Sequence, residues 1–158
     1  MMMGDMIEPK TGDVSNLSLA IATMQNIVTA LNGLRFLPAY PSGAIPITAA
    51  SGNKANAVAT ATLAALSGKT TYLTGFHISS AGATAAVIVS VTVTGTITGT
   101  LTYTYPCVAG VTTGNASLIV TPPIPIPASA TNTTIAVSLP ALGAGGTHAS
   151  VVAYGYQV

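Results

Sequence analysis

The sequence predicts a mainly β protein, an antiparallel β-sandwich of the jelly-roll-like type, preceded by an N-terminal arm and one amphipathic helix. Between residues 57 and 158, apolar and hydroxyl side chains alternate with the period of two that is typical of half-buried strands. Turns rich in Gly, Ser and Asn separate these alternating stretches. Further upstream, one stretch of apolar residues has helical spacing instead.

Residues 1–13 are predicted to form an N-terminal arm. This segment contains all three acidic residues of the chain together with Lys10. Asp5, Glu8 and Pro9 occur before any apolar run of the kind found in a secretory signal peptide, so we do not expect one. Its composition is typical of a flexible or docking arm.

Residues 14–34 are predicted to form an amphipathic helix. Their apolar side chains recur at intervals of three and four residues, which is the spacing of a heptad repeat. Asp13 lies where an N-cap is favoured, and Gly33 lies where a C-terminal cap is expected. The predicted contact stripe consists of Val14, Leu17, Ile21, Met24, Val28 and Leu31.

The stripe of this helix requires a partner surface, because an isolated helix of this length is only marginally stable in water. Two partners are compatible with the pattern: sister copies of the helix in an oligomer, or the β domain of the same chain. Ile27 and Leu34 widen the apolar face, which suits a larger bundle or packing onto a domain. We favour self-association.

Residues 35–56 are predicted to form an extended connector. Three prolines and two glycines in this segment exclude a regular helix. The only regular element expected here is a short strand at Ala44–Thr48.

Residues 57–158 are predicted to form the β-sandwich domain. Seven or eight short strands separated by turns, over a domain of this length, are typical of an antiparallel sandwich. The predicted strands are Val58–Leu66, Thr71–Ser79, Val87–Thr94, Thr100–Tyr105, Ser117–Thr121, Thr134–Leu139 and Ala149–Gln157.

The sandwich is almost without charge. Asp, Glu, Lys and Arg make up 4% of the chain, against about a quarter in ordinary globular proteins, and none follows Lys69. Charged side chains usually protect exposed sheet edges from unwanted pairing. We therefore expect these edges to be protected by an oligomer or a partner, and one of them to be blunted by the proline-rich run at 122–127. Threonine and serine hydroxyls are expected to hydrate an outer face.

Two classes of partner are not expected. The net charge is +1 and the sequence has no cluster of Lys and Arg, so nothing indicates binding to nucleic acid. No apolar stretch approaches the roughly 18 residues that a membrane-spanning helix requires.

Few side chains of the β domain could support chemistry. A metal site or a Cys–His dyad would have to be built from His77, His148 and Cys107. Neither histidine lies in a recognisable motif, and the domain has no carboxylate to orient one. We therefore expect no enzyme activity, no metal and no cofactor, with both histidines at a surface or interface. Cys107 is expected to be a small apolar residue at a strand end.

Four tyrosines alternate on the predicted strands: Tyr103, Tyr105, Tyr154 and Tyr156. Such residues can form a surface on which glycans stack. We favour packing in the core or at an interface, because aromatic side chains bury a large area.

The order of several segments resembles that of small structural proteins of tailed-bacteriophage virions, of the capsid-decoration or head-fibre type. The resemblance covers roughly residues 57–158. The segments that carry it are Ala61–Phe76, Gly82–Ala86, Gly99–Tyr103, the stretch at 125–135 and the stretch from Gly143 to Tyr156.

The resemblance implies a jelly-roll-like sandwich, usually trimeric, that is displayed on the virion surface and bound to the major capsid protein. It supplies no catalytic residues. We therefore hypothesise a non-enzymatic virion structural protein that decorates or cements the capsid exterior as a homotrimer, with the helical stripe as anchor or central bundle. The alternative is a fibre or spike module that binds a receptor or glycan, with the helix as its oligomeric stalk.

Overall fold

The computed structural model describes residues 19–26, 40–111 and 113–158 of the chain. The chain divides into two compact units, Met1–Ala39 and Tyr40–Val158.

In the first unit, residues 19–26 form an α-helix inside the predicted range 14–34. Ile21 and Met24 of the predicted stripe lie on this helix, with exposed fractions of 49% and 66%. The Thr23 hydroxyl donates a hydrogen bond to the Leu19 carbonyl at 2.9 Å. The arm at 1–13 and the other four stripe residues, Val14, Leu17, Val28 and Leu31, lie outside the described residues.

The second unit is built from strands. Among its described residues they are β1 (Ile45–Ala50), β2 (Ala59–Leu63), β3 (Thr71–Ala81), β4 (Val87–Thr96), β5 (Gly99–Cys107), β6 (Leu118–Val120), β7 (Ile126–Pro127), β8 (Ile135–Leu139) and β9 (His148–Gln157).

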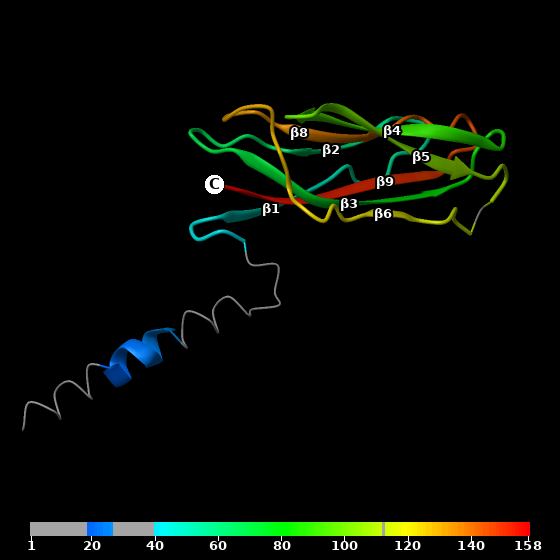
Figure 1. Cartoon of the computed structure of the whole chain (residues 1–158). Helices are drawn as coiled ribbons and strands as arrows, with labels where there is room; N and C mark the ends of the chain where they lie inside the picture. Colours follow the sequence, from blue (N-terminus) through cyan, green and yellow to red (C-terminus); the bar gives the residue numbers. More distant parts are fainter. Residues whose placement is uncertain (1–18, 27–39, 112) are drawn as a thin grey trace, which may run out of the picture. The chain divides into compact units, whose positions relative to one another are not determined.

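These strands form two sheets that lie face to face (Figure 1). Sheet A has the order β1-β9-β3-β6, with β7 also pairing with β3, and sheet B has the order β2-β8-β4-β5. Four antiparallel pairings are nested along the chain, so that each lies within the sequence range of the one before: β1·β9, β2·β8, β3·β6 and β4·β5. The two-residue β7 is outside this pattern. The predicted antiparallel, jelly-roll-like sandwich is thus confirmed.

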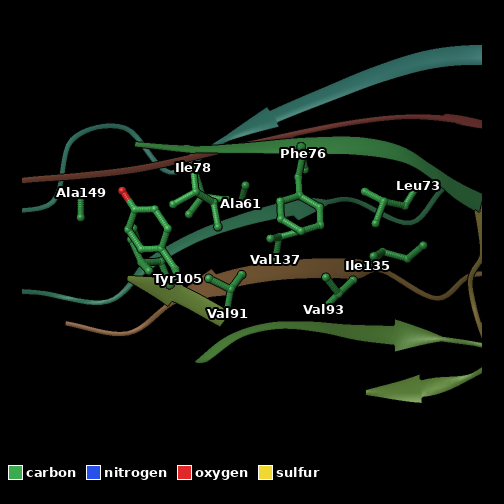
Figure 2. Packing of buried hydrophobic residues seen from close by; sticks show 14 of the residues in the cluster. Ala61, Leu73, Phe76, Ile78, Val91, Val93, Tyr105, Ile135, Val137 and Ala149 are labelled. Carbon is green, nitrogen blue, oxygen red and sulfur yellow. The ribbon is translucent and has the colours of Figure 1, made fainter. Parts of the chain in front are cut away.

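The core lies between the two sheets and is formed by alternate residues of their strands. Figure 2 shows side chains from both sheets meeting there, among them Phe76 and Ile78 from β3 and Val91 and Val93 from β4. The inward positions of β8 are Ile135, Val137 and Leu139, and all three are fully buried. The alternation of apolar and hydroxyl residues therefore separates core from surface as predicted.

The sandwich begins earlier in the chain than residue 57, the boundary that the sequence predicted. Strand β1 lies in the segment expected to be a connector, and it pairs along its whole length with β9. Pro46 lies in this strand opposite Tyr156. Because β1 is at the edge of sheet A, the missing N–H of Pro46 can be tolerated there.

Polar side chains inside the sandwich have hydrogen-bond partners. Gln157 is 4% exposed, and its amide donates to the Ala64 carbonyl at 2.6 Å and to the Thr71 hydroxyl at 3.3 Å. Among the described residues, no buried side-chain nitrogen or oxygen is left without a partner. Gln157 thereby ties the last strand to the segment that follows β2.

Candidate interaction surfaces

The three side chains considered for chemistry do not converge. Cys107 is the last residue of β5 and points into the core, with 3% of its surface exposed. His77 lies opposite Val152 and His148 lies opposite Ala81 in the β3·β9 pairing, on the outer face of sheet A. Four residues of β3 separate these two rows, or about 13 Å along the strand. The metal-site and dyad interpretations therefore have no geometric basis, and the described residues contain no group of three potential ligands.

Cys107 behaves as a small apolar side chain at a strand end, as the sequence predicted. Burial raises the pKa of its thiol, and hydrogen bonding with Ser80 only partly opposes this shift. The neutral thiol is thus the form that the fold favours. Nucleophilic chemistry would require the thiolate instead.

The outer face of sheet A carries a tyrosine cluster, which we define as Tyr40, Tyr72 and Tyr156. The rings of Tyr72 and Tyr156 are stacked, with centroids 4.9 Å apart, and Tyr40 packs edge-on against Tyr156 at 5.2 Å. Tyr156 is only 6% exposed although it lies outside the core. Burial, and to a lesser degree the neighbouring Tyr72, raise the pKa of its phenol. Tyr72 and Tyr156 meet because β3 and β9 are adjacent strands, and Tyr40 lies in the segment that leads into β1, the other neighbour of β9.

The rest of this face is apolar or neutral. Ala50, Val152, His77 and Ile119 follow one another across the four strands of sheet A. Ile119 is 70% exposed, and Tyr154 on the same face is 43% exposed. Sheet A thus presents a neutral surface with accessible aromatic and aliphatic groups, the composition found at contact surfaces.

The four tyrosines that the sequence singled out do not form one surface. Tyr105 lies in the core with 1% of its surface exposed, and Tyr103 packs edge-on against Phe76 with ring centroids 5.2 Å apart. Tyr154 and Tyr156 lie on the outer face of the opposite sheet. The preference for packing over a single glycan-stacking surface is confirmed for Tyr103 and Tyr105.

The outer face of sheet B carries mostly hydroxyl groups. Thr60, Ser138, Thr92 and Thr102 form a row across its four strands, and the Thr60 and Ser138 hydroxyls are 2.8 Å apart. Most other outward positions of the sheet are also threonine or serine, including Thr62, Ser90, Thr94 and Thr104, and the exceptions are Ile88, which is 70% exposed, Pro106 and Ala136. These groups can hydrogen-bond to water without any net charge. The hydroxyl face predicted from the sequence is therefore concentrated on sheet B, although Thr48, Ser79 and Ser150 also lie on the outer face of sheet A.

Charged side chains are absent from all nine strands of the described β unit. The described charged residues are Lys54 and Lys69, which both lie between strands. The proline-rich run lies along the β6–β7 edge of sheet A, where Pro127 pairs with Tyr72. That edge is divided into two very short strands, as expected for a proline-blunted edge.

Comparison with known proteins gives no match to any protein-family model, curated protein or solved structure. In the described part of the chain, no helix has both the length and the apolar character needed to cross a membrane. The interpretation of function therefore depends on the surfaces described above.

Proposed function

We propose that this chain is a non-enzymatic structural protein that decorates and cements the exterior of a bacteriophage capsid as a homo-oligomer, with the homotrimer that the family resemblance implies. The observation that carries the proposal is the absence of charge from every described strand of the sandwich. Neutral sheet edges and faces are a liability for a protein that works alone, and an advantage for one that works between neighbours.

The difference between the two outer faces supports a defined orientation. A protein that covers a shell needs one surface that contacts its neighbours and another that stays hydrated. The outer face of sheet A, with Tyr154 and Ile119 exposed, suits contact with sister subunits or the major capsid protein. The hydroxyl face of sheet B suits exposure to water. Each Å² of apolar surface buried by such a contact would contribute roughly 25 cal/mol to holding the shell together.

The helix supports self-association. Ile21 and Met24 are three residues apart, so they lie on the same side of the helix, and both have large exposed fractions. Burial of this stripe against sister helices would place the anchor or central bundle of the oligomer in the first unit.

The jelly-roll-like fold is compatible with this role, because viral capsid domains use it. The same architecture serves many unrelated functions, so the fold is consistent with the proposal but does not by itself identify the function. The neutral surface is the stronger argument.

The first test is the native mass of the full-length protein, measured by sedimentation equilibrium. We expect a stable homo-oligomer of the 15.6 kDa chain. A protein that stays monomeric at micromolar concentration would contradict the proposal.

The second test is binding to capsid shells that lack the decoration protein. We expect the wild-type protein to co-sediment with the shells and to raise the temperature at which they open. Tyr154→Lys, on the outer face of sheet A, should weaken binding, whereas the matched Thr62→Lys on sheet B should not. Equal effects of the two lysines would contradict the proposed orientation.

A second candidate function is a fibre or spike module that binds a glycan. Tyr154 favours it, because its ring is 43% exposed and can stack on a sugar. Binding of the wild-type protein to a glycan array, lost in Tyr154→Ala, would support this function. Absence of binding together with shell association would support cementing.

A further inference from the structure

The sandwich is not completely closed along the β5 side. Strand β5 is an edge strand of sheet B and contacts β3 of sheet A through Tyr103 and Phe76. Leu101 and Tyr103 point inward but are only partly buried, whereas their partners on β4, Val93 and Val91, are fully buried. Apolar surface of the inner layer therefore remains accessible at this edge.

Strand β5 is also the most open edge of the β unit. It has 9 residues, compared with 6 in β1, 5 in β2 and 3 in β6. Within residues 40–111 and 113–158 it pairs with β4 alone, and it contains no charged side chain. Its one proline, Pro106, is close to its end. The usual protections of a sheet edge are therefore missing from most of its length.

The position of Pro106 shows which backbone groups point away from β4. Pro106 pairs with Ile88 inside the ladder, and a proline is tolerated there when its nitrogen points away from the neighbouring strand. The amide of Val108, two residues later, does point away, because it donates to the Asn115 side chain at 2.8 Å. Backbone groups in antiparallel strands alternate in direction, so those of Thr102 and Thr104 also point to the open edge.

We propose that the open edge of β5 pairs with β5 of a second copy of this chain, antiparallel about a two-fold axis, with Thr102 opposite Thr102 of the other copy. In this register, Thr100 of each copy pairs with Thr104 of the other. Pro106 then falls beyond the paired stretch, opposite Thr98, which precedes β5. The missing N–H of Pro106 therefore costs the contact no hydrogen bond.

The same register covers the exposed apolar surface. Leu101 of one copy lies opposite Tyr103 of the other, and the reverse, on the inner side of the extended sheet. On the outer side the threonines of the two copies meet and continue the hydroxyl row. No like charges face each other, so nothing in the strand opposes self-pairing. Such an isologous contact uses the same surface twice, as two-fold dimers do.

This two-fold contact is separate from the trimer proposed above, so an experiment can contradict one proposal and leave the other standing. The direct test is disulfide formation by Thr102→Cys in the full-length protein under mild oxidation. Residues opposite each other in a hydrogen-bonded antiparallel pair have Cα atoms about 5.5 Å apart, within the range of a disulfide. The matched control is Ser90→Cys, on the same outer face one strand away from the edge.

We expect Thr102→Cys to form covalent dimers about ten times faster than Ser90→Cys, and we expect Thr104→Cys to form fewer than Thr102→Cys. Equal rates for Thr102→Cys and Ser90→Cys would overturn the proposal. Faster cross-linking through Thr104→Cys than through Thr102→Cys would overturn the register.

The second test is the native mass of lysine variants. Ser90 and Thr104 are register partners, and both are exposed on the outer face of sheet B. Thr104→Lys should raise the apparent Kd of the two-fold contact by about tenfold, and Ser90→Lys should leave it unchanged. A wild-type protein that stops at a trimer and does not cross-link through position 102 would overturn this contact and leave the proposed function standing. A dimer that Thr104→Lys dissociates to monomers would support this contact and contradict the trimer.

Discussion

The hydroxyl oxygen of Ser80 on β3 lies 2.9 Å from that of Tyr105 on β5, so one buried hydrogen bond joins the two sheets. Asn115 donates to the same Ser80 oxygen at 3.0 Å and accepts a hydrogen bond from the Val108 amide at 2.8 Å. Ser80 therefore connects sheet A, sheet B and the loop that leads to β6. Figure 2 shows Tyr105 among the core side chains.

We predict that Tyr105→Phe lowers the free energy of unfolding by about 1 kcal/mol. One buried hydrogen bond is lost in this variant, while the hydrogen bond from Asn115 to Ser80 remains. Ser80→Ala should cost more, about 2 kcal/mol, because it leaves both Tyr105 and Asn115 without this partner. Urea unfolding of both variants and of the double variant measures these effects. Purely additive losses would show that the two hydroxyls do not interact.

The stability of the β unit is predicted to fall in alkaline solution. Burial raises the pKa of the Cys107 thiol and of the Tyr105 phenol above their ordinary values. Above about pH 8.5 for cysteine and about pH 10 for tyrosine, the unfolded chain releases protons that the folded chain retains. Unfolding is then favoured, so this stability is fully present below about pH 8.5 and is lost as the pH rises through the folded pKa values.

Urea unfolding between pH 7 and pH 11 measures this loss. The fall should begin at higher pH in Cys107→Ala, because the ordinary pKa of a cysteine thiol is lower than that of a tyrosine phenol and the unfolded chain then releases its first proton at higher pH. An unchanged onset in that variant would show that Cys107 does not contribute to the pH dependence.

Two glycines near the β4–β5 turn allow the energetic cost of backbone strain to be measured apart from the cost of steric crowding. Gly95 and Gly99 both have φ of 82°. A Cβ at Gly95 would collide with the Thr134 carbonyl oxygen, whereas one at Gly99 would meet nothing within 4 Å. We predict that Gly99→Ala costs about 1 kcal/mol of unfolding free energy from the positive φ alone. Gly95→Ala should cost at least twice as much, and equal losses in thermal unfolding would contradict this account.

Most strands could be predicted because burial imposes a period of two on them. Ile135–Leu139 is a clear case: its three inward positions are apolar and fully buried, and its strand lies within the predicted range. For β1, the sequence predicts a short strand but assigns it to a connector outside the sandwich. The reason is Pro46, which argues against a strand in a sheet although the edge position of β1 tolerates it. β7 was not predicted, because its two residues are too few for any alternation.

The surfaces were harder to predict, because they depend on which strands are neighbours. Alternation shows that Tyr154 and Tyr156 lie on one side of their strand, but not which residues lie beside them. Tyr72 lies beside Tyr156 through the pairing of β3 with β9, and Tyr40 precedes β1, which pairs with β9 on its other side. His77 and His148 likewise share a face because β3 pairs with β9. No local pattern in the sequence encodes these long-range pairings.

The helical stripe is predicted to hold the oligomer together. Ile21→Glu places a charge on the stripe, where burial against a sister helix would be costly, so the native mass in sedimentation equilibrium should fall. Ala22→Glu places the same charge one residue away, outside the predicted stripe, and it should leave the mass unchanged. An equal decrease in both variants would indicate a general effect of charge on the helix rather than a specific contact.

Amide exchange along β5 is predicted to alternate. The amides of Leu101 and Tyr103 should exchange slowly in every state, because they donate to β4, while those of Thr102 and Thr104 point to the open edge. In Thr104→Lys at a concentration below its raised Kd, where the two-fold contact is dissociated, the Thr102 amide should exchange at least about a hundredfold faster than the Tyr103 amide. In the wild-type protein at high concentration, pairing with the second copy should protect Thr102 as well. Slow exchange at Thr102 in the dissociated variant would mean that its amide faces β4, and the register inferred from Pro106 would then be wrong.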